Sequence, residues 1–335
     1  MSFEKEAPAQ LRPGQRLARV CANLGDQARV MIEGADCDAV IAGALSYAAE
    51  SSADLPVTGD WVAVRQVEAH TVLIEHVFPR RSWISRRAAG RRDVEQVLAS
   101  NVDLAFIVTG LDGDYNLRRL DRYLAVAREG GVEPVIVLNK ADVCEGASDI
   151  AEEVRRTLRV ANVLPISARS GHGCHQIEAM LQAGLTAVLL GSSGAGKSTL
   201  LNRLLGAELN RTQPVRESDS RGRHTTTHRQ LIELASGAAL IDTPGLREIQ
   251  LWASPDSIAA VFDDIEALAT NCRFRDCTHS NEPGCAVRDT VDPGRLHSFH
   301  KLRQESLRHT ETRTEKQRWR SIHKAARQFY KLRGH

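Results

Sequence analysis

The 335-residue sequence lacks long apolar runs and is poor in aromatic residues. No stretch of 18 consecutive apolar residues occurs, which argues against a membrane-spanning helix. Residues 1–10 lack the apolar core of a secretory signal, so we expect a cytoplasmic protein with no membrane partner. Aromatic residues make up 4% and charged residues 26% of the chain, as in soluble globular proteins. A chain of this length can form two or three domains, each with its own core.

The pattern of the seven cysteines does not indicate a disulfide framework. Cys21, Cys37, Cys144 and Cys174 are scattered, and such cysteines are most often small buried apolar residues. The other three lie within a short segment near the C-terminus. In a cytoplasmic chain, a cluster of this kind favours metal binding over disulfide formation.

The net charge is only +2, but it is unevenly distributed. Residues 301–335 contain 11 Lys or Arg and 3 Glu, a local charge of +8, which leaves −6 for residues 1–300. A basic arm favours an acidic partner, with nucleic acid as the first candidate. Trp319, Phe329 and Tyr330 lie among its cations, which suits stacking on bases. The alternative is a charged tail that is partly disordered.

Residues 14–79 contain five short segments in which apolar and polar residues alternate, separated by turns. Such a series predicts a small closed barrel of the OB or SH3-like type, and we assign it to residues 1–95. The basic segment Arg80–Arg92 includes Trp83 and suits contact with RNA. A linker with Trp83 packed on the barrel explains that segment equally well. The five segments are Arg16–Cys21, Ala28–Glu33, Asp38–Gly43, Asp60–Val67 and Thr71–Val77.

From residue 103 onward, apolar strands alternate with amphipathic helices. Asn116 can cap the first helix, and Ser148–Val160 forms the next. This alternation predicts an α/β domain with a mostly parallel sheet, which we assign to residues 96–253. The expected strands are Leu104–Val108, Pro134–Leu138, Val163–Ile166, Ala187–Leu190 and Ala239–Ile241.

A phosphate-binding loop follows the fourth of these strands, because G-S-S-G-A-G-K-S fits the pattern GxxxxGK[ST]. Its backbone N–H groups would surround the phosphates of a nucleotide, with Lys197 on the β- and γ-phosphates and the Ser198 hydroxyl on Mg²⁺. A glycine-rich turn can match by chance, but the strand before it and the helix after it disfavour that alternative. The nucleotide-binding residues are Gly191, Ser192, Ser193, Gly194, Ala195, Gly196, Lys197, Ser198 and Thr199.

The motif N-K-A-D follows the second strand and fits the guanine-reading pattern NKxD. The carboxylate of Asp142 would accept hydrogen bonds from guanine N1–H and the 2-amino group, a donor pair that adenine lacks. Asn139 would brace the surrounding loops, and Lys140 would lie along the base. Ser167 and Ala168 resemble the companion loop that meets guanine O6. Each short motif taken alone is also compatible with an ordinary turn at a strand end.

The motif D-T-P-G ends the fifth strand. Asp242 can hold a water on Mg²⁺, and the N–H of Gly245 can sense the γ-phosphate. Upstream, R-G-R-H-T-T-T-H has no apolar period and predicts a loop, in which Thr226 is our choice to complete the Mg²⁺ shell.

Leu246 stands where many GTPases carry a glutamine that orients the attacking water. A leucine cannot position water, so His224 is the best candidate for a general base or water orienter. The alternatives for His224 are a solvent-exposed loop histidine and a contact to RNA phosphate.

The order of the motifs indicates a circularly permuted GTPase, because Asn139 precedes Gly191 by 52 residues. The same sheet can still form, since the original termini would be neighbours in space. Permutation makes D-T-P-G the last part of the G domain, so the domain that follows is connected directly to the γ-phosphate sensor.

The C-terminal part, residues 254–335, predicts a helical zinc-binding domain with a basic tail. Ser254–Pro255 opens a helix that we expect to run to Ala269, and Pro293–Arg308 is a second, basic helix. Between them lies C-x₄-C-x-H-x₅-C, a closed tetrahedral set that favours structural Zn²⁺. A redox cluster is the weaker alternative, because a histidine suits a metal better than disulfide exchange. The predicted zinc ligands are Cys272, Cys277, His279 and Cys285.

The barrel, the permuted order, and the motifs R-H-T-T-T-H, D-T-P-G, C-R-F-R-D-C-T-H and E-P-G-C-A-V resemble the RsgA (YjeQ) family of small-subunit-dependent GTPases over nearly the whole chain. The resemblance implies an OB domain, a permuted G domain and a zinc domain. It implies GTP hydrolysis to GDP and phosphate in late 30S maturation, with turnover stimulated by the subunit and contact with 16S rRNA. The family's switch histidine maps onto His224, and its zinc ligands onto the four predicted residues.

Two other functions stay open at this point. One is a non-enzymatic rRNA-binding assembly factor for which GTP is only a regulatory ligand. The other is a P-loop kinase or ATPase, against which Asp142 argues. We expect the protein to be a monomer.

Overall fold

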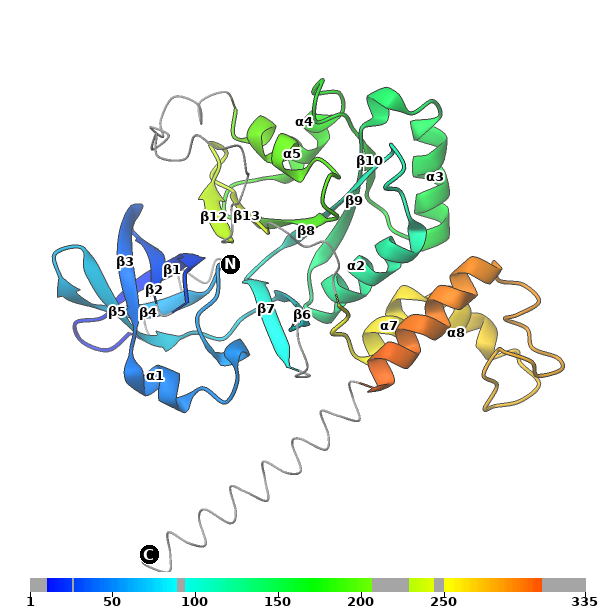
Figure 1. The fold of residues 1–335 in the computed structure, drawn as a ribbon, viewed down its shortest axis with the longest axis horizontal. Coiled ribbons are helices and arrows are strands. Elements are labelled where there is room, and N and C mark those ends of the chain that lie inside the picture. The colour runs from blue at the N-terminus through cyan, green and yellow to red at the C-terminus, as the bar shows by residue number, and fades with distance from the viewer. Residues whose placement is uncertain (1–10, 26, 89–93, 207–228, 244–249, 309–335) are drawn as a thin grey trace, which may run out of the picture.

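The structure is a computed structural model that describes residues 11–25, 27–88, 94–206, 229–243 and 250–308 (Figure 1). A barrel, an α/β domain and a helical segment follow one another along the chain. Strands of the first two join into one sheet of order β10-β9-β8-β11-β13-β12-β1-β2-β3-β5-β4. Within the described residues, no helix has the length and apolar character needed to cross a membrane.

The N-terminal barrel contains five strands, as the sequence predicts. β1 pairs with both β2 and β4, which closes the barrel, while β3 and β5 run parallel. Alternate side chains such as Val20, Val30 and Ile74 fill its interior. This confirms an OB-type barrel. Its elements are β1 (Arg16–Asn23), β2 (Gln27–Ile32), β3 (Ala35–Ile41), α1 (Gly43–Ala48), η3 (Ser52–Asp54), β4 (Trp61–Glu68) and β5 (Thr71–Val77).

A two-stranded sheet, β6 (Trp83–Arg87) and β7 (Glu95–Ser100), follows the barrel. Just before it, the Arg80 guanidinium pairs with Asp60 at 2.8 Å, and the two side chains are 15% and 0% exposed. The guanidinium of Arg80 is therefore engaged within the protein and stabilises the barrel. For this part of the basic segment, this favours a linker packed on the barrel over contact with RNA. The predicted domain boundary after residue 95 falls in β7 and stays a prediction, as does the one after residue 253.

Within its described residues, the α/β domain has five parallel strands and one antiparallel strand, β12. Helices α2 and α3 cover one face of the sheet and α4 and α5 the other (Figure 1). The expected strands and the α2 cap are confirmed, since Asn116 accepts a hydrogen bond from the Arg119 N–H at 3.2 Å. The elements are β8 (Leu104–Gly110), α2 (Leu117–Glu129), β9 (Glu133–Asn139), η4 (Ala141–Val143), α3 (Ala147–Leu158), β10 (Val163–Pro165), α4 (Cys174–Met180), β11 (Thr186–Gly191), α5 (Lys197–Leu204), β12 (Gln230–Glu233) and β13 (Ala239–Asp242).

The C-terminal segment begins with two short helices, α7 (Pro255–Val261) and α8 (Asp263–Ala269). The sequence predicted one continuous helix here. The chain leaves helical geometry at Phe262 (φ −112°, ψ 41°), whose ring is fully buried and packs on Phe299 at a centroid distance of 5.4 Å. The break thus falls at the residue whose ring is held in the core by a residue of the later helix. A helix over residues 293–308 confirms the second expected helix.

A buried charge network attaches this segment to α2. The guanidinium of Arg295, 6% exposed, lies 3.3 Å from the Asp121 carboxylate on α2 and 2.7 Å from Asp264 on α8. Burial raises the pKa of Asp121 to about 6, although Arg295 opposes the rise. A second pair, Arg122 and Glu305, joins the same two elements through bonds of 2.7 and 2.9 Å. The helix over residues 293–308 is thereby fixed to the G domain.

Candidate functional site

The phosphate-binding loop leaves the buried strand β11 and enters α5 at Lys197. Gly191 has φ +141°, and a Cβ there would lie 2.1 Å from the Val108 carbonyl oxygen. Gly196 has φ +94°, and its Cβ would lie 2.2 Å from Asn139 Nδ2. Only glycine fits these two positions, because each combines a left-handed backbone with a close neighbour. The glycines of the motif therefore have the structural role that a phosphate loop requires.

Lys197 lies folded along this loop. Its Nζ donates to the carbonyl oxygens of Gly191 at 2.8 Å and Ser192 at 2.6 Å. Burial lowers the pKa of Lys197, and the carboxylates of Asp242 and Asp114 oppose that shift. A partly desolvated cation at the start of a helix is suited to bind phosphate oxygens.

Asn139 connects the guanine-reading loops to the phosphate loop. Its Nδ2 donates to the Ala195 carbonyl at 2.8 Å, and its Oδ1 accepts from the Ala168 N–H at 2.9 Å. The side chain is almost fully buried. Three motifs that are distant in sequence therefore meet at one amide.

Lys140 and Asp142 follow at the exposed end of β9. Lys140 has a left-handed backbone (φ 65°), and its ammonium bonds the carboxylate of Asp112. Asp142 lies exposed in η4 and lines a recess together with Pro165 and His172. Its carboxylate is accessible to a ligand, as a base reader must be.

Asp242 ends β13, directly beside the phosphate-loop strand. Burial raises the pKa of Asp242, while Lys197 opposes the shift. Next to it, the hydroxyl of Thr243 donates to the Leu189 carbonyl at 2.6 Å and fixes the strand end. Ser198 and Thr199 lie exposed in the first turn of α5. The Lys and Ser side chains expected around a magnesium nucleotide thus come from the first turn of α5, and the Asp side chain comes from the end of β13.

Three predicted residues, His224, Thr226 and Gly245, lie outside the described residues, and their roles stay predictions. So do the aromatic residues of the basic tail, Trp319 and the Phe329–Tyr330 pair.

Two residues that the sequence analysis did not single out support the site. Asp114 accepts a hydrogen bond from the Ser192 hydroxyl and pairs with Arg119. Arg203 on α5 donates to the carbonyls of Ala168 at 2.7 Å and Arg169 at 2.8 Å. Asp114 belongs to no motif, so no sequence pattern marks it as part of the site. Arg203 lies in the last turn of α5, where a cation is ordinary, so its role depends on the tertiary fold.

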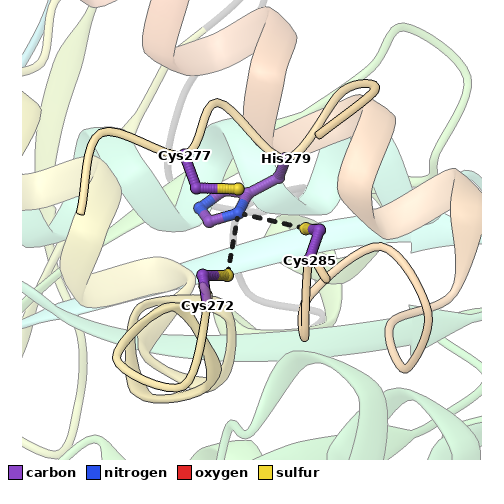
Figure 2. Close-up of side chains that lie close together, drawn as sticks. All are labelled: Cys272, Cys277, His279 and Cys285. Atoms are coloured by element: carbon purple, nitrogen blue, oxygen red, sulfur yellow. Dashed lines mark hydrogen bonds between the residues drawn. The ribbon is translucent and has the colours of Figure 1, made fainter. Parts of the chain in front are cut away.

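The four predicted metal ligands converge on one point, from the loop between α8 and the helix over residues 293–308 (Figure 2). Their ligand atoms all lie within 4.8 Å of one another. His279 Nδ1 is 3.6 Å from Cys272 Sγ and 3.5 Å from Cys285 Sγ, and the sulfur of Cys277 faces the same imidazole. Three thiols and an imidazole at this spacing form a closed set that fits a tetrahedral metal.

Backbone N–H groups around the cluster donate hydrogen bonds to the cysteine sulfurs. Burial opposes ionisation of Cys272, but the N–H groups of Val287 and Ala286 donate to its sulfur and lower its pKa overall. The N–H of Arg288 points at Cys285 Sγ at 3.3 Å. Such donors stabilise thiolates, the form that binds metal. His279 has φ 61°, and this uncommon backbone turns its imidazole toward the sulfurs.

Two solved structures share this fold. YjeQ from Thermotoga maritima is 22% identical, with a TM-score of 0.64 over 88% of this chain and 99% of that one. YloQ, described as a circularly permuted GTPase, is 20% identical, with a TM-score of 0.60 over 87% of this chain and 95% of its own.

Sequence comparison gives closer relatives. The small ribosomal subunit biogenesis GTPase RsgA of Opitutus terrae is 48% identical over 317 residues, which cover 88% of this chain and 86% of the relative. RsgA 2 of Lactiplantibacillus plantarum is 43% identical over 300 residues, or 87% and 84% of the two chains. The RsgA GTPase family model matches residues 77–252. The phosphate-loop motif, the N-K-A-D motif and the Cys₃His cluster thus stand in a chain that belongs to the RsgA GTPase family and is a GTP hydrolase with a permuted G domain.

Proposed function

We propose that this protein binds the small ribosomal subunit and acts in late 30S maturation, hydrolysing GTP to GDP and phosphate with turnover that the subunit stimulates. The observation that carries the proposal is the Asn139 bridge, which joins the guanine reader to the phosphate loop. Relatives covering most of the chain are named small ribosomal subunit biogenesis GTPases, which supports the choice of partner.

Within this function, the carboxylate of Asp142 reads guanine N1–H and the 2-amino group, and the S-A loop meets O6. Lys197 and the N–H groups of the phosphate loop bind the β- and γ-phosphates. Ser198, Asp242 and Thr226 hold Mg²⁺, and the Gly245 N–H senses the γ-phosphate. The pairing of β11 with β13 supports this arrangement, because β11 leads to Lys197 and β13 ends at Asp242.

The metal that we assign to the cysteine cluster is a single structural Zn²⁺. A closed Cys₃His set leaves no position for substrate, so the ion would stabilise the loop between α8 and the next helix. We place the protein in the cytoplasm as a monomer, with 16S rRNA as the docking surface for its basic elements. The positive charge of residues 301–335 supports the RNA contact.

Turnover measured with purified small subunits tests the proposal. GTP hydrolysis should be slow alone, roughly 10⁻⁴ to 10⁻² s⁻¹ as in unassisted GTPases, and should rise steeply with subunits. The stimulation should weaken strongly between about 50 and about 200 mM salt, because docking on RNA releases counterions. A rate of GTP hydrolysis that does not change when small subunits are added would contradict the small subunit as the partner.

His224→Ala tests the proposed catalytic histidine in the same assay. We expect GTP affinity close to wild type and a loss of stimulated turnover of about 100-fold or more, the usual effect of removing a general base. His228→Ala is the matched control from the same predicted loop. Unchanged stimulated turnover in His224→Ala would remove this residue from the mechanism.

A further inference from the structure

A polar groove runs between α2 and the helix over residues 293–308, with a volume of about 680 Å³. Both of its walls carry cations. Arg118, Arg119 and Arg122 come from the G domain, and Lys301 comes from the C-terminal helix. The groove is therefore a basic surface shared by the two parts of the chain that the Arg295 network fixes together.

Two of these cations are already neutralised within the protein. Arg122 forms paired bonds with Glu305, and Arg119 pairs with Asp114. Arg118 and Lys301 are exposed, and among the described residues no ion pair joins either of them to a carboxylate. One uncompensated charge thus remains on each wall.

We propose that the phosphodiester backbone of an RNA strand lies in this groove, bound by Arg118 on one wall and Lys301 on the other. The inference rests on the proposed function and adds to it the place and the chemistry of one contact. Exposed guanidinium and ammonium groups that face a common channel are complementary to successive phosphates. The groove offers no exposed aromatic or aliphatic anchor, which a protein partner would need at the centre of an interface.

The groove is also connected to the nucleotide site. Arg119 pairs with Asp114, and the other oxygen of Asp114 accepts the hydrogen bond of the Ser192 hydroxyl in the phosphate loop. A phosphate beside Arg119 competes with Asp114 for the guanidinium, and this changes how firmly Asp114 holds the loop. Gln250, which lines the groove, comes five residues after Gly245 in the sequence. RNA in the groove is thereby coupled to GTP turnover.

The double variant Arg118→Glu/Lys301→Glu tests the groove, with Arg156→Glu on the exposed side of α3 as the matched control. Binding is measured to intact small subunits and to protein-free 16S rRNA over a salt series. For both ligands we expect the double variant to bind about tenfold or more weakly, with the slope of log K against log salt reduced by about 1 to 2. Basal GTP hydrolysis should equal wild type, because neither residue touches the nucleotide site.

A salt slope equal to wild type, or an equal loss in Arg156→Glu, overturns the inference. Weaker binding to subunits with unchanged binding to protein-free rRNA also overturns it, because the groove then takes an acidic protein. If the wild-type chain does not bind small subunits, the proposed function is contradicted. Binding of the double variant to protein-free 16S rRNA still tests the groove in that case.

Asp114→Asn tests the coupling. This change keeps an acceptor for Ser192 but removes the charge that holds Arg119. We expect RNA affinity within about twofold of wild type, since the phosphate ligands Arg118 and Lys301 are intact, and a several-fold smaller ratio of stimulated to basal turnover. A ratio equal to wild type overturns the coupling.

Discussion

At the scale of single residues, Asn139 determines how the two halves of the nucleotide site fit together. One amide uses its donor for the phosphate loop and its acceptor for the S-A loop. Because the side chain is buried, losing either bond would leave an unpaired polar backbone group, at a cost of about 1–3 kcal/mol. The amide thus sets the register between the N-K-A-D segment, the S-A loop and the phosphate loop.

Asp142→Asn should change which base the protein prefers. Guanine offers two donors to a carboxylate, whereas xanthine offers one donor and one carbonyl acceptor, the pattern that an amide complements. We expect GTP affinity to fall by at least about 10- to 100-fold and XTP affinity to rise above that for GTP. Competition binding with GTP, XTP and ATP measures this. Asp149→Asn, at an exposed site in α3, serves as the control. Retained guanine preference in Asp142→Asn would show that another group reads the base.

The motif residues could be predicted because their chemistry depends on local spacing. Gly191 and Gly196 are required by backbone conformation, which a motif encodes directly. Arg80, Asp114 and Arg203 could not be predicted, because their partners are fixed only when distant segments pack. Arg80 illustrates the limit: a cation in a basic run was a candidate for RNA contact, but it pairs with the buried Asp60.

At the scale of elements, the loop between α8 and the next helix has ligands for a metal and little apolar core of its own. The buried Cys285 and Val287 are its main apolar contacts with the domain core. The proposed zinc would therefore be the main source of stability for this loop.

Metal analysis of the purified protein should find one zinc per chain. Cys285→Ser should lose most of it and lower the thermal midpoint of the C-terminal segment, while GTP binding persists because the cluster shares no residue with the phosphate loop or the N-K-A-D segment. Cys144→Ser, at a half-buried cysteine outside the cluster, should keep its zinc. If the wild-type protein contains no zinc and all three clustered thiols react, the assignment of a structural zinc site is wrong.

Element types were predictable where an apolar period is long and strong, as in the barrel strands and in β8, β9 and β11. The β6–β7 pair and β12 were missed. β12 has only four residues, Gln230–Glu233, and it exists because β13 and β1 flank it. The break between α7 and α8 was missed for a similar reason. Phe262 fits a helical face by spacing, but the ring is buried against Phe299, which belongs to a later helix.

At the scale of the whole molecule, a buried carboxylate controls how the C-terminal segment is held. Burial raises the pKa of Asp121 to about 6, so the folded state binds this proton more tightly than the unfolded chain. The stability that Asp121 contributes is therefore greatest near pH 4 and is lost as the pH rises to about 6. Other carboxylates act in the opposite direction, among them Asp264, whose pKa Arg295 lowers against the effect of burial.

Asp121→Asn isolates this effect. The free energy of unfolding of wild type relative to the variant should fall by about 1–2 kcal/mol between about pH 5 and about pH 7.5. Urea unfolding at the two pH values measures it, and the exposed Asp36→Asn is the control. A difference between wild type and Asp121→Asn that does not change with pH would mean that Asp121 titrates with an ordinary pKa.

The joined sheet has a consequence for the order in which a nascent chain can fold. The barrel strands are contiguous in sequence and can close as soon as β5 has left the ribosome that makes the chain. The permuted order also delivers the base-reading strands, β8 to β10, before the phosphate-loop strand β11. The pairing of Ala22 with Gln230, which joins barrel to G domain, must wait for β12. Translation therefore completes the guanine reader first, the phosphate loop second and the junction with the barrel last.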